Sequence, residues 1–248
     1  GTILPRANLM SMMSGGTSLE DLQAALIRLE EDPAVETIVL DIDSPGGTVT
    51  LVEETAALIR SLETRTVAVA NGMAASAAYW LASAADELVV TPSGEVGSIG
   101  VWTAHTDISA AERAAGRRTT LIRAGKYKIE GHPFGTLSDE AKAEMQRRVD
   151  AIYDRFVSDV AAGRNTTDVR VRERFGQGRM VMAAEALALG MVDRVAPLSD
   201  VLASLDADPV AVAAAAALDD RAWMFDDPRF GAPGEDKRLR YDPHTDRW

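Results

Sequence analysis

The chain of 248 residues contains no cysteine and only three histidines. Without cysteine, the protein forms no disulfide bond, uses no thiol nucleophile and holds no cysteine-ligated zinc. His105, His132 and His244 are the three imidazoles open to metal or base chemistry. We therefore expect neither a metal ion nor a cofactor.

Basic residues are also scarce, with 26 Lys and Arg against 38 Asp and Glu and a net charge of −12. This balance argues against a nucleic acid partner, whose phosphates need clustered Lys and Arg. No apolar run reaches the roughly 20 residues that span a bilayer, and no basic signal peptide opens the chain. Residues 1–5 have the pattern of a strand already under way, so we expect that residues upstream of Gly1 are missing.

The chain does contain an alternation of strand-like and helix-like runs up to about residue 195, which is typical of a mostly parallel α/β fold. The strands that we predict cover residues 35–42, 65–70, 87–90 and 119–123. The helices that we predict cover residues 51–62, 77–85, 109–116, 138–162 and 183–189, together with one that Thr17 or Ser18 caps. Residues 91–100 are predicted to form a glycine-punctuated loop.

The composition changes at about residue 206. Residues 211–217 are almost all alanine, with little to bury, and residues 225–248 are rich in Pro, Gly, Asp and Arg. We therefore predict one domain over residues 1–205 and an Ala-rich segment with a flexible tail over residues 206–248. A methionine-rich stretch at residues 8–16 is predicted to be a loop.

Ser76 stands between the strand-like run 65–70 and an alanine-rich helix that begins at Ala77. Free backbone N–H groups and the positive end of the helix dipole gather at this point, and they would stabilise negative charge on a substrate oxygen. A serine that merely caps a buried helix has the same local pattern. This stretch by itself leaves both interpretations open.

A second candidate is Ser44-Pro45-Gly46-Gly47, which follows the strand-like run 35–42. Its two glycines would let a peptide backbone approach and would point bare N–H groups at it. The same four residues also suit an ordinary turn, so this motif is equally open to two interpretations.

Five motifs occur in a fixed order: Ser-Pro-Gly-Gly (44–47), Met-Ala-Ala-Ser-Ala (73–77), Val-Gly-Ser-Ile-Gly-Val (96–101), Ala-Gly-Lys-Tyr-Lys (124–128) and Gly-Met-Val-Asp (190–193). Together they resemble the signal peptide peptidase A-like serine peptidases, a group that includes bacteriophage and prophage capsid-assembly proteases. The resemblance covers about residues 2–205. It implies an α/β, Clp-protease/crotonase-like fold with repeated β-β-α units and a C-terminal helical extension.

The resemblance also implies a Ser/Lys dyad, with Ser76 as the nucleophile and Lys128 as its base. A serine hydroxyl needs a base to become a nucleophile, and a lysine serves as one only when burial or a cationic neighbour keeps its amine neutral. Lys126 lies two residues away, and its assignment as the solvent-facing lysine rests on the resemblance.

Three further roles follow from the same resemblance. The backbone N–H groups of Ala77 and of Gly46 or Gly47 match the donors of an oxyanion hole. Ser98 matches a polar position that orients the lysine.

The main rival mechanism is a Ser-His-Asp triad. Clp proteases resemble this chain in Ser-Pro-Gly-Gly and Met-Ala-Ala-Ser, and their histidine lies in the general region of His105. The equivalent segment here reads Gly97-Ser98-Ile99-Gly100, without a histidine. We therefore interpret His105 as a surface residue of the following loop, and we expect His132, which precedes a proline, in a turn.

The leading hypothesis is a homo-oligomeric serine endopeptidase that processes capsid or scaffold proteins of a phage, in the bacterial host cytoplasm or the procapsid. One alternative is a signal-peptide-degrading peptidase, cytoplasmic or membrane-associated. Two others belong to different classes: a crotonase-like acyl-CoA enzyme that uses the same glycine-rich oxyanion hole, and a non-catalytic assembly protein. The sequence names neither the substrate nor the oligomer size.

Overall fold

The computed structural model describes residues 1–7, 15–206 and 212–214. Most of the methionine-rich stretch and all of the chain from residue 215 lie outside the described residues, as do the predictions made for them. The domain boundary at residue 205 stays a prediction.

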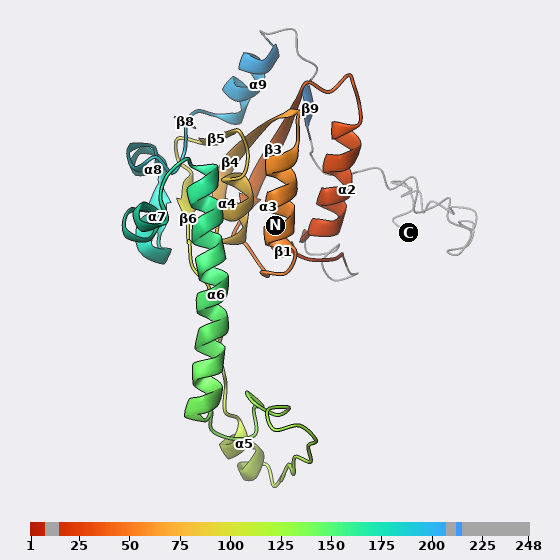
Figure 1. Ribbon diagram of the computed structural model, residues 1–248, viewed down its shortest axis with the longest axis vertical. Coiled ribbons are helices and arrows are strands. Elements are labelled where there is room, and N and C mark those ends of the chain that lie inside the picture. Colours follow the sequence, from red (N-terminus) through yellow and green to blue (C-terminus); the bar gives the residue numbers. More distant parts are fainter. Residues whose placement is uncertain (8–14, 207–211, 215–248) are drawn as a thin grey trace, which may run out of the picture. The chain divides into compact units, whose positions relative to one another are not determined.

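A seven-stranded, mostly parallel sheet forms the centre of the fold (Figure 1). Its strand order is β7-β6-β4-β3-β9, with β5 paired to β4 and β8 paired to β5. Only the β6–β7 pair is antiparallel among these strands. The strands are β3 (Thr37–Ser44), β4 (Arg65–Ala75), β5 (Glu87–Val90), β6 (Glu95–Gly97), β7 (Met180–Met182), β8 (Arg194–Val195) and β9 (Val212–Ala214). A separate parallel pair joins β1 (Ile3–Leu4) to β2 (Thr17–Ser18).

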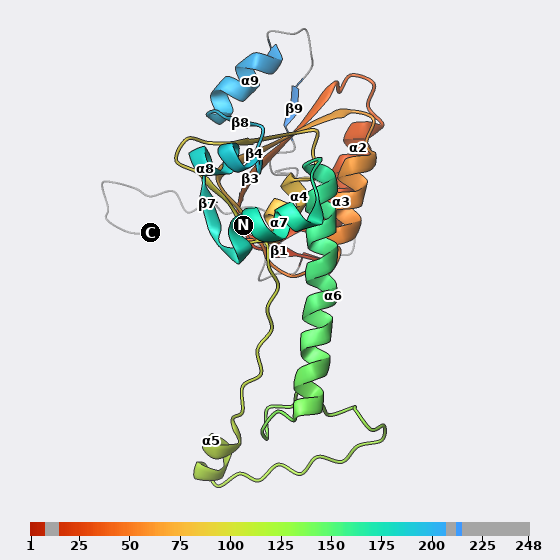
Figure 2. The same ribbon diagram turned by 60° about the vertical axis from the view of Figure 1, so that its left-hand side comes forward.

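Helices pack on both faces of this sheet. One face, with Ile38, Leu40 and Ala68, packs with α2, α3, α4 and α6 in the main core, and Figure 2 shows these helices together on that side. The other face, with Val39 and Val67, packs against α9. The helices are α2 (Leu19–Glu30), α3 (Val52–Ser61), α4 (Ala77–Ala82), α5 (Ser109–Ala114), α6 (Asp139–Gly163), α7 (Asp168–Arg174), α8 (Ala183–Leu189) and α9 (Leu198–Asp206). This arrangement confirms the predicted α/β fold.

Most predicted elements are confirmed, and the expected caps explain where two helices begin. The Ser18 hydroxyl accepts the Asp21 N–H at the start of α2, and the Ser138 hydroxyl accepts the Ala141 N–H at the start of α6. Strand β5 has the predicted bounds.

Two predictions are wrong, each because pairing partners far away in sequence decide a strand. Residues 119–123 form no strand, since no described strand pairs with them, and Ile122 is 94% exposed. Residues 91–100 are not all loop, because Glu95–Gly97 pairs with β4 and β7. The sequence predicted no particular element in the alanine run, and Val212–Ala214 of that run pairs with β3.

Strand β4 is longer than predicted and branches. Its first part pairs with β5, from Val67 to Ala70, and its last part pairs with β6, from Met73 to Ala75. Gly72 sits between the two parts with a φ of 109°, which a side chain rarely adopts. This change of partner carries the end of β4, and the residue that follows it, beyond β5.

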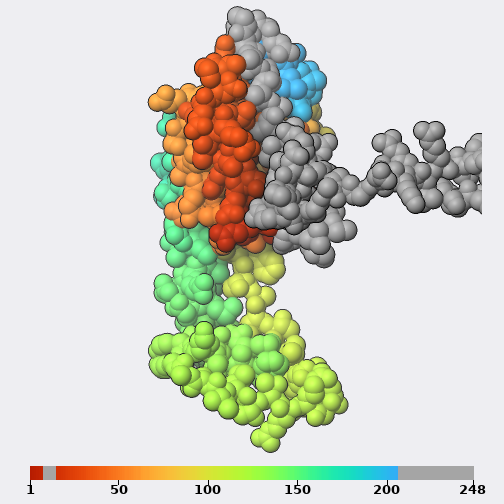
Figure 3. Space-filling view, turned by 90° about the vertical axis from the view of Figure 1, so that its right-hand side faces the viewer, coloured from red at the N-terminus to blue at the C-terminus, as the bar shows by residue number. Residues whose placement is uncertain are grey.

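Residues 101–138 and the first half of α6 extend away from the sheet. We call this segment, residues 101–151, the arm. Figures 1 and 3 show α5 and its neighbours beyond the far end of α6 from the sheet. Between Asp139 and Ala151, Ala141 is the one fully buried side chain, whereas Phe156, Val157 and Val160 enter the main core. Of the helices that the structure describes, none is both long and apolar enough to cross a bilayer.

The Gly-Met-Val-Asp motif fixes the other end of α6. Asp193 accepts two hydrogen bonds from Arg164, at 2.6 and 2.8 Å, and a third from the Leu88 N–H. Burial by itself would raise the pKa of Asp193, but the Arg164 and Leu88 hydrogen bonds and the Arg164 charge outweigh it and hold that pKa below its ordinary value. The folded state therefore favours the carboxylate.

We expect Asp193→Asn to lower the free energy of unfolding at pH 7 by about 1–2 kcal/mol. The substitution leaves the Arg164 guanidinium without its carboxylate, but solvent partly screens the ion pair and so limits the loss. A carboxylate whose pKa is lower in the folded state stabilises the fold at a pH above its unfolded pKa of about 3.9. This stabilisation is lost as the pH falls through the folded-state pKa. Urea unfolding at pH 7 and near pH 3 measures both effects.

The matched control is Asp154→Asn, which breaks an exposed pair with Arg172. It should change the stability by less than about 0.5 kcal/mol. Equal losses in the two variants at pH 7, or an Asp193→Asn loss that persists undiminished near pH 3, would contradict this account.

Candidate active site

Ser76 lies in a strained turn between β4 and α4. Its φ of 54° and ψ of −121° are unusual for a residue with a side chain. The Ser76 N–H donates to the Gly97 carbonyl at 2.8 Å, and the Ser76 carbonyl accepts the Trp80 N–H at 3.0 Å. The main chain is thus held on both sides, and the half-buried side chain is left at the mouth of a cavity. A plain N-cap serine would accept an N–H from the helix, and the Ser76 hydroxyl accepts none.

The Ser-Pro-Gly-Gly turn packs directly against Ser76. Gly46 has a φ of 91°, and a Cβ there would lie 2.7 Å from the Ala75 carbonyl oxygen and 2.8 Å from Ser76 Cβ. This close approach requires glycine. The structure therefore brings together two motifs that lie about 30 residues apart, because the carboxyl ends of adjacent parallel strands meet at one edge of a sheet.

Two backbone N–H groups beside Ser76 are not used within the described part of the chain. Ala77 is the first residue of α4, so its N–H has no partner inside the helix. The Gly47 N–H makes no hydrogen bond with any described residue, since the β-bridge to Ile3 uses the Gly46 carbonyl and the Thr48 N–H. The Gly46 N–H, by contrast, donates to the Ser44 hydroxyl at 3.1 Å. The geometry thus favours Gly47 over Gly46 as a donor.

The cavity at Ser76 has a volume of about 420 Å³. Ser98 lines it, with a φ of 52°, and its N–H donates to the Arg179 carbonyl at 2.9 Å. Gly100 and Val101, which belong to the Val-Gly-Ser-Ile-Gly-Val motif, also line the cavity. Thr2, Trp102 and Gly178 complete the lining, and no sequence motif marked these three. Trp102 is 85% exposed, which is unusual for tryptophan, but this exposure is a property of the folded chain.

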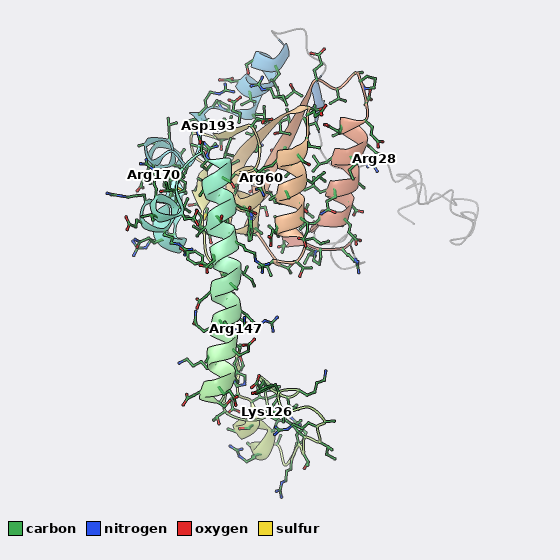
Figure 4. All side chains as sticks on the ribbon, in the orientation of Figure 1. Arg28, Arg60, Lys126, Arg147, Arg170 and Asp193 are labelled. Carbon is green, nitrogen blue, oxygen red and sulfur yellow. The ribbon has the colours of Figure 1, made fainter. Side chains whose placement is uncertain are left out.

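Lys128 does not lie in this cavity. It sits in a turn of the arm, where it is exposed and forms no hydrogen bond or ion pair with another described side chain. Lys126 donates to Tyr127 Oη at 2.6 Å and to Glu140 at 3.0 Å, and these bonds raise its pKa. Figure 4 labels Lys126 at the far end of α6 from the sheet. Among the residues that the structure describes, one chain alone therefore brings no lysine to Ser76.

The two described histidines also lie on the arm, away from Ser76. His105 Nε2 donates to the His132 carbonyl at 3.0 Å, and His132 Nδ1 accepts the Phe134 N–H at 3.1 Å. Neither lines the Ser76 cavity, and His244 lies outside the described residues. The described residues hold no group of three His, Cys, Asp or Glu that is suited to a metal ion.

Two family models and several known proteins match this chain. Residues 60–212 match the model of peptidase family S49, and residues 9–96 match that of Clp protease. Capsid assembly protease C of Escherichia phage lambda is 33% identical over 204 residues, which cover 82% of this chain and 46% of that protein. Head-tail preconnector protein GP5 of Enterobacteria phage P21 is 36% identical over 163 residues, covering 65% of this chain and 32% of that protein.

A cellular relative also matches. Putative signal peptide peptidase SppA of Enterococcus faecium is 31% identical over 183 residues, or 73% of this chain and 53% of that protein. The chain spans less than half the length of the two phage relatives. The family model covers more than half of this chain, including the Ser76 turn, the arm and the Gly-Met-Val-Asp motif. The chain belongs to peptidase family S49.

Proposed function

We propose that the protein is a serine endopeptidase and that Ser76 forms an acyl-enzyme. Ser76 Oγ gives its proton to a neutral amine and bonds to the scissile carbonyl carbon. The resulting oxyanion accepts hydrogen bonds from the N–H groups of Gly47 and Ala77. The amine then passes its proton to the leaving nitrogen, and water, deprotonated by the same amine, releases the acyl group. The observation that carries this proposal is the strained Ser76 beside two N–H groups that donate to no described residue.

We further propose that the base is Lys128 of a second copy of the chain. Lys128 is exposed on the arm, and the Ser76 cavity contains no basic side chain among the described residues. The arm also has the character of a docking element: Trp102 and Ile122 are 85% and 94% exposed. Residues 101–138 carry six Arg and Lys against three Asp and Glu, in a chain whose net charge is −12. A basic, apolar arm is complementary to the acidic remainder of another copy. Docking would also bury the lysine, as a neutral amine requires.

The substrate class is proposed from the relatives. The two phage relatives are named as a capsid assembly protease and a head-tail preconnector protein. We propose that this peptidase cuts capsid or scaffold proteins of a phage, in the host cytoplasm or the procapsid. Co-expression with head and scaffold proteins encoded nearby, followed by mass mapping of the fragments, tests this substrate. Intact head and scaffold proteins beside a peptidase that is active on peptides would refute it.

Covalent labelling tests the nucleophile. We expect a fluorophosphonate to add its phosphonyl group to the wild-type chain at Ser76, because the oxyanion site also suits the tetrahedral adduct. Mass spectrometry of the digested protein locates the adduct. Ser93→Ala, a change at an exposed serine outside the cavity, should label like the wild type. Labelling that survives in Ser76→Ala would remove Ser76 from this role.

The oligomeric state is a second expected result. Light scattering at micromolar concentration should give a mass that is a multiple of 26.5 kDa. Replacing the exposed apolar residues together, as Trp102→Ser and Ile122→Ser, should shift the mass toward the monomer while the core stays folded, because neither side chain contacts that core. A wild-type protein that is entirely monomeric would contradict the proposed second copy.

A further inference from the structure

One cluster of side chains joins the helix of the nucleophile to the helix of the arm. Trp80 of α4 stacks on Phe156 of α6, with ring centroids 4.5 Å apart and planes 5° from parallel. The Trp80 Nε1–H donates to Asp159 Oδ2 at 2.7 Å, and Arg60 of α3 donates to Asp159 Oδ1 at 3.0 Å. Both oxygens of Asp159 are thus engaged, by two helices other than its own.

The contact continues one turn further along α6. A Cβ at Gly163 would lie 1.9 Å from the carbonyl oxygen of Ser83, the C-cap residue of α4. Phe156, Asp159 and Gly163 follow the i, i+3, i+7 spacing of a single helix face. That face of α6 therefore runs along α4 from the first turn of α4 to its end, and we call these contacts the α4–α6 joint.

The joint is connected directly to Ser76. The Trp80 N–H donates to the Ser76 carbonyl, so Trp80 belongs to the first turn after the nucleophile. On the other side, α6 is continuous through the arm, where Glu140 in its first turn pairs with Lys126, two residues from Lys128. Figure 4 labels Arg60 near the sheet end of α6, Arg147 midway and Lys126 at the opposite end.

We propose that the α4–α6 joint sets the direction of the arm relative to Ser76, and that Trp80, Asp159 and Gly163 are positioning residues for the reaction. The inference rests on the proposed function, in which the arm of one copy delivers Lys128 to Ser76 of another. In a closed ring of identical copies, the angle between the arm and the rest of each chain fixes the position of every arm relative to the neighbouring copy.

The length of the helix makes this angle important. From Phe156 to Asp139, α6 rises about 25 Å at roughly 1.5 Å per residue. A rotation of about 5° at the joint moves the far end of such a helix by about 2 Å, and a misplacement of about 1 Å at a reacting group can cost about 100-fold in rate. The part of α6 before Ile152 cannot correct the angle, because its described side chains lie outside the main core.

The test measures the angle and the rate together. The chain has no cysteine, so spin labels can be placed at Ala57→Cys in α3 and Ala143→Cys in the arm, both exposed positions. Doubly labelled chains are diluted into unlabelled ones, so that electron–electron distances arise within one chain. We compare Trp80→Phe, which removes the indole N–H, and Gly163→Ala, which pushes α6 from α4, with the control Ala162→Ser at an exposed neighbour.

We expect one narrow distance in the wild type and in Ala162→Ser, and a shifted or broadened distance in Trp80→Phe and Gly163→Ala. In these two variants kcat should fall by about 10-fold or more with KM little changed, because the cavity itself is intact. If Gly163→Ala does not fold, the conservative Trp80→Phe decides.

An unchanged distance in Trp80→Phe overturns the inference, and so does a changed distance with normal kcat. Either result leaves the proposed function standing, provided that Ser76→Ala and Lys128→Ala remain inactive. Activity in Lys128→Ala would instead refute the part of the proposed function in which Lys128 is the base.

Discussion

Chains with Ser76→Ala and chains with Lys128→Ala should each be inactive, but their co-assembled mixture should regain about a quarter of the wild-type rate. Each proposed site takes its serine from one copy and its lysine from another. In an equal mixture, half of the serines and half of the lysines are intact, so about one site in four is complete. Co-expression of two differently tagged chains, with single-turnover cleavage of a peptide as the readout, measures this.

Several controls sharpen the complementation experiment. Chains with Lys128→Arg should be as inactive as chains with Lys128→Ala, because a guanidinium stays protonated and accepts no proton. Lys126→Ala and His105→Ala should keep most of the activity, since Lys126 is paired with Glu140 and His105 with a carbonyl of the arm.

The wild-type rate should also rise with pH, because a lysine must lose its proton before it acts as a base. No recovery of activity in mixed oligomers that contain both tags would place the dyad within one chain. Loss of activity in His105→Ala with survival in Lys128→Ala would replace the dyad by a histidine mechanism.

Gly46→Ala should lower kcat by about 100- to 1,000-fold, the range seen when one oxyanion donor is lost. The added methyl group would lie 2.7 Å from the Ala75 carbonyl oxygen and 2.8 Å from Ser76 Cβ, at a φ of 91°. The turn has to move away from Ser76, and it takes the neighbouring Gly47 N–H with it. Steady-state kinetics on a peptide substrate, together with the melting temperature, separates this effect from unfolding.

Gly190→Ala is the matched control for Gly46→Ala. Gly190 also has a positive φ, of 80°, but no described atom outside the adjacent chain lies within 4 Å of the position that a Cβ would take. This variant should therefore show a similar loss of stability from backbone strain, about 1 kcal/mol, with normal kcat. Equal kcat values in the two variants would show that Gly46 is remote from the reacting atoms.

The sequence by itself determined the elements of the active-site turn. Glycines after one strand and a serine between the next strand and a helix are local patterns. The family resemblance implied that Gly46 or Gly47 lies near Ser76. Gly46 does so because β3 and β4 are adjacent parallel strands whose carboxyl ends meet at the same edge. Likewise, side chains next to the helix starts predicted the caps at Ser18 and Ser138.

The tertiary structure decided what depends on partners far away in sequence. Strand β4 reaches Ser76 only because β6 pairs with its last residues, and residues 119–123 form no strand because nothing described pairs with them. The motif around Lys128 marks a lysine, but the position of that lysine in the sequence does not determine where it lies relative to the sheet. That depends on the α4–α6 joint, whose aromatic stack and carboxylate contacts arise only when the helices pack.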